Sequence, residues 1–134
     1  MWAMENVREP RQRPRVLSRS ARAVQLAEES DDPSLLIVIL CDRFSVLYAT
    51  FEDPHGCVEL AKRIEGLARD SVDEGHLLNA AVAVAQSTMM TGDFATSDEA
   101  LLLAEALAAR VHRPVRLWLA RAWLATRTAM RGDL

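Results

Sequence analysis

The 134-residue sequence predicts an all-α protein, built as a short stack of about three antiparallel helical hairpins. Half of the residues are apolar, yet only 5% are aromatic, and glycine and proline number five each. The core must therefore consist mainly of Ala, Leu and Val, and Ala and Leu are strong helix formers. A sandwich or barrel would need more aromatic and β-branched residues and many more turns.

Start and stop signals divide the chain into six helical segments. Asp-Pro pairs at 32–33 and 53–54 each place a capping carboxylate before a proline that loses no hydrogen bond at the first helical position. Residues 71–74 have the Ser-x-x-Glu spacing of a capping box, and Gly92 supplies a residue that tolerates a left-handed helix end. The expected helices cover 18–30, 33–50, 54–70, the capping box to 91, 96–111 and 114–130.

The run of small apolar residues from Ala80 to Ala85 also fits a buried strand. We predict a helix, because small residues on all sides suit the close packing of an inner helix. The flanking residues also keep a helical composition.

Internal similarity indicates repeats. Leu-Ala pairs recur at 26–27, 60–61 and 103–104, at matching places in the first, third and fifth expected helices. Their spacings fall within the range of two-helix repeats. One hairpin cannot bury its apolar faces alone, so neighbouring hairpins are expected to stack.

Residues 1–17 contain two prolines, four arginines and no apolar periodicity. We therefore predict a flexible basic arm over 1–17 and a helical-repeat domain over 18–134. Charge is uneven: six Arg face two Glu in 1–22, sixteen acids face four bases in 23–109, and six Arg face one Asp in 110–134. This asymmetry indicates either a charged partner or basic ends that pair with the acidic middle of the same molecule.

Three segments carry a family resemblance: ELAKRIEGLARD (59–70), MTGDFATSDEALLLAEALA (90–108) and RPVRLWLARAWLATRTAMRGDL (113–134). Through them the chain resembles the tetratricopeptide-like (TPR-like) helical region of large actinobacterial signal-transduction ATPases. These include LuxR-type transcriptional regulators and adenylate cyclases that carry an AAA-type ATPase. The resemblance implies a TPR-like α-solenoid that transmits a signal or binds a partner, while nucleotide hydrolysis and DNA binding lie in other domains. The sequence contains no Gly-x-x-x-x-Gly-Lys-Ser/Thr phosphate loop, and it stops at Gly132-Asp133-Leu134, where the next repeat would begin. We therefore expect a fragment of a longer solenoid.

No group of residues in the sequence predicts catalysis or metal binding. Cys41 and Cys57 lack Cys-x-x-Cys spacing, and His55, His76 and His112 are scattered near expected helix ends. Neither paired carboxylates in apolar surroundings nor a Ser or Cys with a nearby His stands out. We expect no enzymatic activity, no catalytic residue, no cofactor and no metal.

Two sets of residues are candidates for an interaction surface. Trp118 and Trp123 lie five residues apart on the last helix, about 140° apart around its axis. We expect one to fill the core and the other to lie where a following repeat would pack. The second set lies on the third and fifth helices, which usually line the concave surface of such solenoids, although ordinary solvated charge also explains it. Its members are Glu59, Lys62, Arg63, Glu99 and Glu105.

These observations predict a non-catalytic protein–protein interaction or signal-sensing scaffold, with a protein partner or a second copy bound through the C-terminal helix. Two alternatives stay open: a nucleic-acid-binding accessory protein that uses the Arg-rich termini, and a self-assembling structural fragment. Nucleic acid is the less favoured partner, because no aromatic residues alternate with the arginines. The most apolar run, 35–40, is short and is followed at once by charged residues, so we expect a soluble cytoplasmic location without membrane contact.

Overall fold

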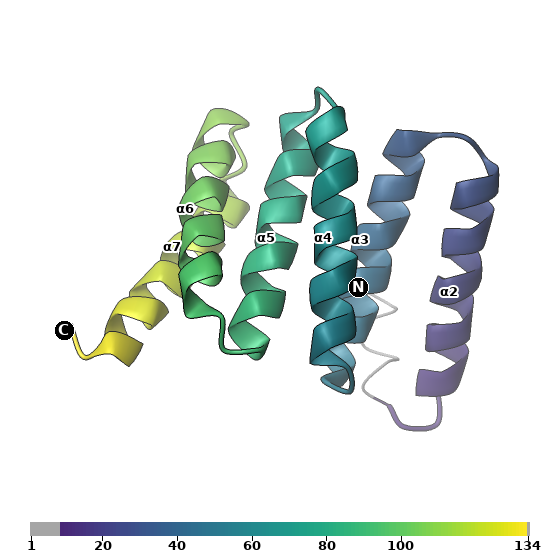
Figure 1. Cartoon of the computed structure of the whole chain (residues 1–134), viewed down its shortest axis with the longest axis horizontal. Coiled ribbons are helices and arrows are strands. Elements are labelled where there is room, and N and C mark those ends of the chain that lie inside the picture. The colour runs from purple at the N-terminus through teal and green to yellow at the C-terminus, as the bar shows by residue number, and fades with distance from the viewer. Residues whose placement is uncertain (1–8, 134) are drawn as a thin grey trace.

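The computed structural model describes residues 9–133, and within them the chain forms six helices and no strand (Figure 1). Each helix packs against the next one along the chain, and turns of three residues connect them. The predicted all-α stack of hairpins is therefore confirmed. The helices are α2 (Arg13–Glu29), α3 (Pro33–Thr50), α4 (Pro54–Asp70), α5 (Glu74–Met90), α6 (Phe94–Arg110) and α7 (Pro114–Arg131).

The first helix begins earlier than predicted. α2 starts at Arg13, so residues 13–17 of the predicted arm are helical, and residues 1–8 lie outside the described part. The early start has a physical cause: Val16 is buried against Val46 of α3. In addition, the guanidinium of Arg43 on α3 donates a hydrogen bond to the Leu17 carbonyl at 2.7 Å. Proline in the first turn of α2 is compatible with this start.

The predicted capping box at the start of α5 does not form. Asp73 caps α5 instead, accepting a hydrogen bond from the Gly75 amide at 2.7 Å. Ser71 serves the preceding helix, because its hydroxyl donates to the Ala68 carbonyl at 2.9 Å. A carboxylate directly before the helix reaches the free amides, and the serine satisfies a carbonyl at the end of α4. The run 80–85 is helical, as predicted.

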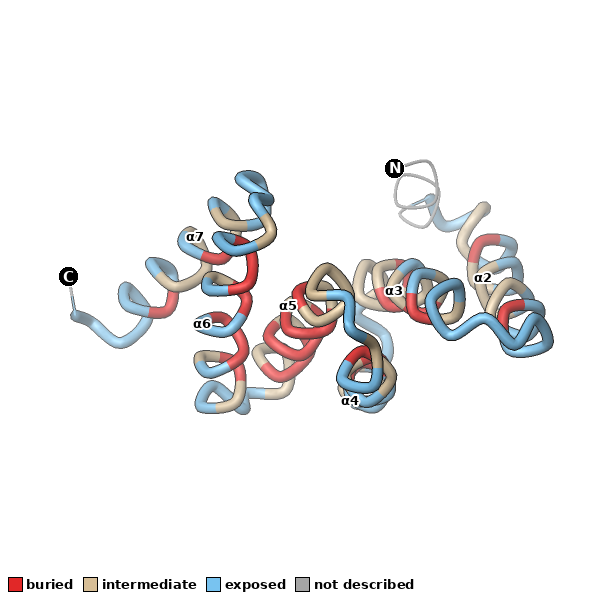
Figure 2. The backbone as a smooth tube through the Cα atoms, turned by 90° about the horizontal axis from the view of Figure 1, so that it is seen from above, coloured by how far each residue is buried: buried red, intermediate tan, exposed pale blue. Residues whose placement is uncertain are grey.

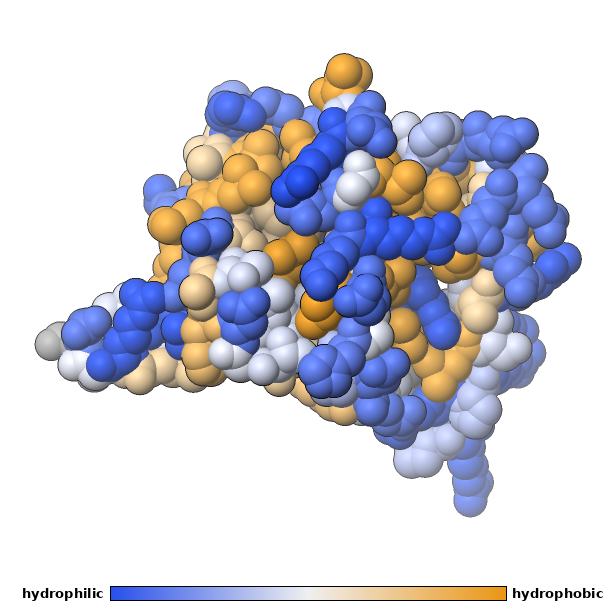
Figure 3. All heavy atoms as spheres, in the orientation of Figure 1, coloured by the Kyte–Doolittle hydropathy of each residue, from blue (hydrophilic) through white to orange (hydrophobic). Residues whose placement is uncertain are grey.

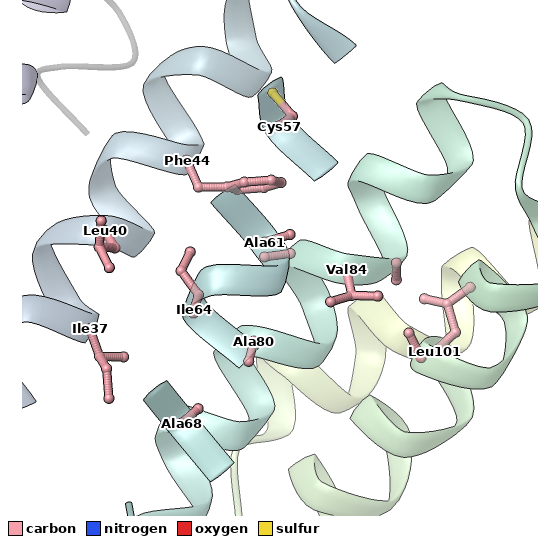
Figure 4. Packing of buried hydrophobic residues seen from close by; sticks show 13 residues of the cluster. Ile37, Leu40, Phe44, Cys57, Ala61, Ile64, Ala68, Ala80, Val84 and Leu101 are labelled. Atoms are coloured by element: carbon pink, nitrogen blue, oxygen red, sulfur yellow. The ribbon is translucent and has the colours of Figure 1, made fainter. Parts of the chain in front are cut away.

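The Ala-rich helix α5 is the centre of the stack. It packs against α3, α4 and α6, and Figure 2 shows many buried positions along it. Most of its buried residues are small. Figure 4 shows larger side chains of α3 and α4 gathered next to Ala80 and Val84 of α5. Small residues on one helix allow larger neighbours to interdigitate at close range. The larger side chains are Ile37, Leu40, Phe44 and Ile64.

Three buried hydroxyl groups are all hydrogen-bonded. Ser87 and Thr88 donate to carbonyls of their own helix, one turn earlier, at 2.8 and 2.7 Å. Ser97 of α6 is fully buried and donates to the Ala85 carbonyl of α5 at 2.9 Å. Because a displaced Ser97 would leave a buried hydroxyl unsatisfied, this bond fixes the register between α5 and α6.

By length and composition, α3 is the one described helix that could cross a membrane, with 18 residues and a hydropathy of 1.5. It is longer than the short run 35–40, because the helix continues through Asp42 and Arg43. The core helix of a soluble protein meets the same criteria, so this is weak evidence for a span. α3 lies between α2 and α4 and contributes Ile37, Leu40 and Phe44 to the main core cluster.

Left-handed backbone conformations shape most of the turns. Gly92 and Gly132 have φ angles of 81° and 80°, which glycine adopts without steric cost because it has no Cβ. Three non-glycine residues adopt the same region: Asp31, Phe51 and His112, with φ angles of 54°, 55° and 54°. Each carries the steric cost of a side chain in this conformation.

We predict that His112→Gly stabilises the protein by about 0.5–1 kcal/mol, because the relief of steric strain exceeds the added entropy of the unfolded chain. Gly92→Ala should destabilise it by about 1 kcal/mol, since space is free around Gly92 and only its φ angle is unfavourable for alanine. Urea unfolding followed by circular dichroism measures both changes. A destabilising His112→Gly substitution would show that the turn depends on the imidazole.

Candidate interaction surfaces

The two tryptophans of α7 face different surroundings. Trp123 is half-buried and packs against the main core cluster, whereas Trp118 is 67% exposed. The inner side of α7 packs on α6 and the core through Leu117, Ala120 and Leu124. The pair therefore divides into one core residue and one exposed residue, as the 140° separation predicts.

Trp118 belongs to an apolar row that we call the outward stripe: Val115, Trp118, Ala122, Ala125 and Ala129. The spacing alternates between three and four residues, which places all five on one side of the helix. Four of them are exposed and Ala122 is half-buried, with Val115 at 70% exposure. No helix of the described chain packs on this side, because α7 packs chiefly against α6.

A carboxylate on α6 anchors the C-terminal half of α7. Arg127, whose side chain is 7% exposed, donates to both carboxylate oxygens of Asp98 at 2.8 and 3.3 Å. Arg131 donates to the same carboxylate, and the Arg127 guanidinium lies 4.1 Å from the centre of the Phe94 ring. The hydrogen bond from Arg127 holds the pKa of Asp98 below its usual value. These contacts tie the end of α7 to the start of α6.

Other ion pairs join the basic ends of the chain to its acidic middle. Arg13 pairs with Glu52 at 2.7 Å, and Arg121 of α7 pairs with Glu105 of α6 at 2.8 Å. Arg110, at the end of α6, pairs with Glu74 at the start of α5. Part of the charge at the basic ends is therefore paired with acidic residues of the same molecule, as one of the two interpretations predicted.

The predicted charged residues of α4 pair with close neighbours. Lys62 contacts Glu59 at 3.4 Å on α4 itself, and Arg63 reaches Glu28 of α2 at 2.5 Å. All of these side chains are substantially exposed, and pairs of this kind contribute little to stability. Figure 3 shows hydrophilic side chains beside apolar surface on one face of the molecule.

The structure brings only two members of the predicted charged set into one hollow. Lys62 and Glu99 both line a hollow of about 370 Å³ between α4 and α6, with α5 at its floor. Glu105 does not line this hollow and pairs with Arg121 of α7 instead. Lys62 and Glu99 are thus the members of the set that share this hollow.

Sequence reasoning missed a group of residues between α5 and α7, next to α3 and α6. Three adjoining hollows, of about 200, 200 and 610 Å³, open there, and Arg116 of α7 lines all three. Asn79 and Gln86 of α5 line two each and lie seven residues apart on the same side of the helix. Two amide side chains at this spacing, on either side of the Ala- and Val-rich run of the helix, were the signal in the sequence.

One of these hollows is apolar, and we call it the α5–α7 cleft. Its walls include Met89 of α5, Leu101 of α6, and Leu119 and Trp123 of α7. Its two long polar side chains are those of Gln86 and Arg116. In Figures 1 and 2, α7 runs away from α5 toward its C-terminal end, and the first half of α7 lines the cleft.

The two cysteines lie in apolar surroundings. Cys57 is fully buried, and Cys41 is half-buried with its pKa raised by burial to about 11. Burial also raises the pKa of Cys57. Both thiols are thus protonated near neutral pH, which makes them poor nucleophiles. In the described part of the chain no three His, Cys, Asp or Glu residues group closely enough to hold a metal ion.

The Asp98 anchor predicts a specific pH dependence. Asp98→Asn should destabilise the protein by about 1–3 kcal/mol at neutral pH, because hydrogen bonds to a charged group are lost. The pKa of Asp98 is lower in the folded protein than in the unfolded chain, so its contribution is complete above about pH 5. It should fade as the pH falls through the folded-state pKa.

Urea unfolding of wild type and Asp98→Asn from pH 7 to pH 3 measures this difference. Asp70→Asn, which removes an exposed carboxylate at the end of α4, is the control and should not reproduce the destabilisation at neutral pH. A difference between wild type and Asp98→Asn that stays constant down to pH 3 would contradict the assigned role.

In the comparisons with known proteins, no protein-family model, curated protein or solved structure matches this chain. The resemblance to the helical region of actinobacterial regulators therefore remains a prediction from the sequence. The function has to be argued from the residues of this chain and from their arrangement.

Proposed function

We propose that this chain is a non-catalytic scaffold that binds a protein partner through the outward stripe of α7. The observation that carries the proposal is the uncovered apolar row on α7, with Trp118 at 67% exposure. A large exposed aromatic within an apolar row is typical of interaction sites, and tryptophan is enriched among the residues that dominate binding energy. This role agrees with the signal-sensing, cytoplasmic region of a bacterial transcriptional regulator that the sequence resembles.

The form of the stripe favours a helix as the occupant. Alternating spacings of three and four residues are the pattern by which one helix packs lengthwise along another. The three alanines of the stripe let a partner backbone approach closely, as the alanines of α5 do within the stack. Val115 and Trp118, near the start of α7, would provide the larger contacts.

Charge complementarity indicates a partner other than a second copy. α7 contains four arginines and no acidic residue, and its ion pairs all take their carboxylates from α6. Of the four, Arg121 lies beside the outward stripe, whereas Arg116, Arg127 and Arg131 project from the opposite side of the helix. Two copies of α7 packed along the stripe would therefore bring their Arg121 side chains close together. α2, at the other end of the stack, carries four arginines before its two glutamates and has the same drawback. The occupant that we propose is an amphipathic helix of another protein, with Glu or Asp beside its apolar row.

The contacts of α7 also weigh against nucleic-acid binding through the C-terminal arginines. Arg121, Arg127 and Arg131 already pair with Glu105 and Asp98. Phosphate contacts would have to compete with these pairs.

A designed peptide tests the proposal. An 18-residue amphipathic helix with Leu at the three–four positions and Glu beside them should bind the full chain, and binding should weaken as salt rises. The same peptide with Lys in place of Glu should bind at least about tenfold more weakly. Trp118→Glu should reduce binding of the Glu peptide by about 30-fold or more, which corresponds to the loss of a dominant interface residue. Fluorescence anisotropy of the labelled peptide measures these affinities.

The matched control is Leu102→Glu, which places the same charge at a leucine of α6 that is 59% exposed and outside the stripe. It should leave the affinity unchanged, and circular dichroism should show both variants folded. Equal losses for the two variants, or equal binding of the Lys peptide, would contradict the proposal. So would a concentration-dependent dimer in light scattering that Trp118→Glu abolishes, since a second copy would then occupy the stripe.

A further inference from the structure

The α5–α7 cleft has the features of a small-molecule site that is separate from the outward stripe. It measures about 200 Å³ and lies on the side of α7 where Trp123, rather than Trp118, is found. Met89, Leu101, Leu119 and Trp123 form apolar walls on three helices. Ligand pockets are commonly apolar hollows between helices with a few polar groups that set the orientation of the ligand.

Two polar side chains lie at one edge of this cleft. Gln86 and Arg116 also line the adjoining hollow next to α3, which places them at the boundary between the two spaces. Within residues 9–133 neither side chain makes a hydrogen bond or ion pair. Arg116 is in this respect unlike the other three arginines of α7, all of which pair with carboxylates of α6. The Arg116 guanidinium and the Gln86 amide therefore line the apolar cleft with hydrogen-bond donors that no other described residue uses.

The size of the cleft limits the ligand. An enclosed apolar cavity of about 150 Å³ accommodates a benzene ring. A cleft of about 200 Å³ therefore has room for one ring or a short branched chain and a small polar group.

We propose that the α5–α7 cleft binds a small monocarboxylate with an aromatic or short aliphatic body, its carboxylate held by Arg116 and Gln86. Guanidinium groups form strong, charge-assisted hydrogen bonds with carboxylates. Asp42 of α3 lines the adjoining hollow with Arg116 but forms no ion pair with it, so the guanidinium remains available. The apolar body would lie against Leu119 and Trp123 and fill the space where α7 diverges from α5.

The two tryptophans of α7 make the proposal directly measurable. In a Trp2→Phe variant of the full chain, two indole N–H resonances remain, and Trp118→Phe assigns them. Benzoate, added up to about 20 mM, should shift the Trp123 resonance along a saturable curve and leave Trp118 unchanged. A dissociation constant of about 1 mM is expected for a ligand with so few atoms. Benzylamine, which has the same ring and the opposite charge, should not produce the saturable shift.

Substitutions on α7 separate recognition of the carboxylate from general effects on the helix. Arg116→Gln should weaken benzoate binding at least tenfold, whereas Arg121→Gln, which removes another exposed arginine of α7, should leave it unchanged. Leu119→Trp, which fills the cleft with a larger side chain, should also suppress binding. The proposal is overturned if benzoate fails to shift the Trp123 resonance or shifts both tryptophan resonances alike. It is also overturned if benzylamine produces the same saturable shift as benzoate, or if Arg116→Gln binds benzoate as tightly as wild type does. None of these readouts requires the protein partner proposed for the outward stripe.

Discussion

The close packing of small residues on α5 against larger side chains of its neighbours is the contact on which the rest of the structure depends. α5 packs against α3, α4 and α6, and Ala80, Ala83 and Ala85 are almost completely buried. Enlarging any of them would push two helices apart, because protein interiors leave little free volume. The Ser97 hydroxyl, which donates to the Ala85 carbonyl, can reach that carbonyl only while the close contact holds. The hairpin stack thus depends on one helix without large side chains.

Both proposed functional surfaces follow from how α7 joins this stack. α7 packs chiefly against α6, through Leu117 and Ala120 on its inner side. The bonds of Arg127 and Arg131 to Asp98 add to this contact. One side of the helix is therefore left uncovered, and a cleft opens on the side toward α5. A partner helix on the outward stripe and a small carboxylate in the cleft would contact opposite sides of the same element.

The sequence predicts the helices well where the signals are local. α3 and α4 begin and end at the predicted residues, because an Asp-Pro pair both caps the helix and fixes its first turn. The early start of α2 was missed, since it depends on contacts of Val16 and Leu17 with α3 that no local pattern reveals. The 140° separation predicted one exposed tryptophan, but only the packing of α7 shows that it is Trp118. Arg116 and Gln86, far apart in the sequence, could not be associated before the fold was known.

Native-state hydrogen exchange tests most directly the claim that α5 is the centre of the stack and α7 a separately attached helix. Exchange measured by NMR in low concentrations of urea resolves local opening from global unfolding. The amides from Ala80 to Ser87 should exchange only through global unfolding. Those of α7 should exchange through a smaller opening that leaves α5 and α6 protected. Equal protection of α5 and α7, with the same dependence on urea, would contradict this account.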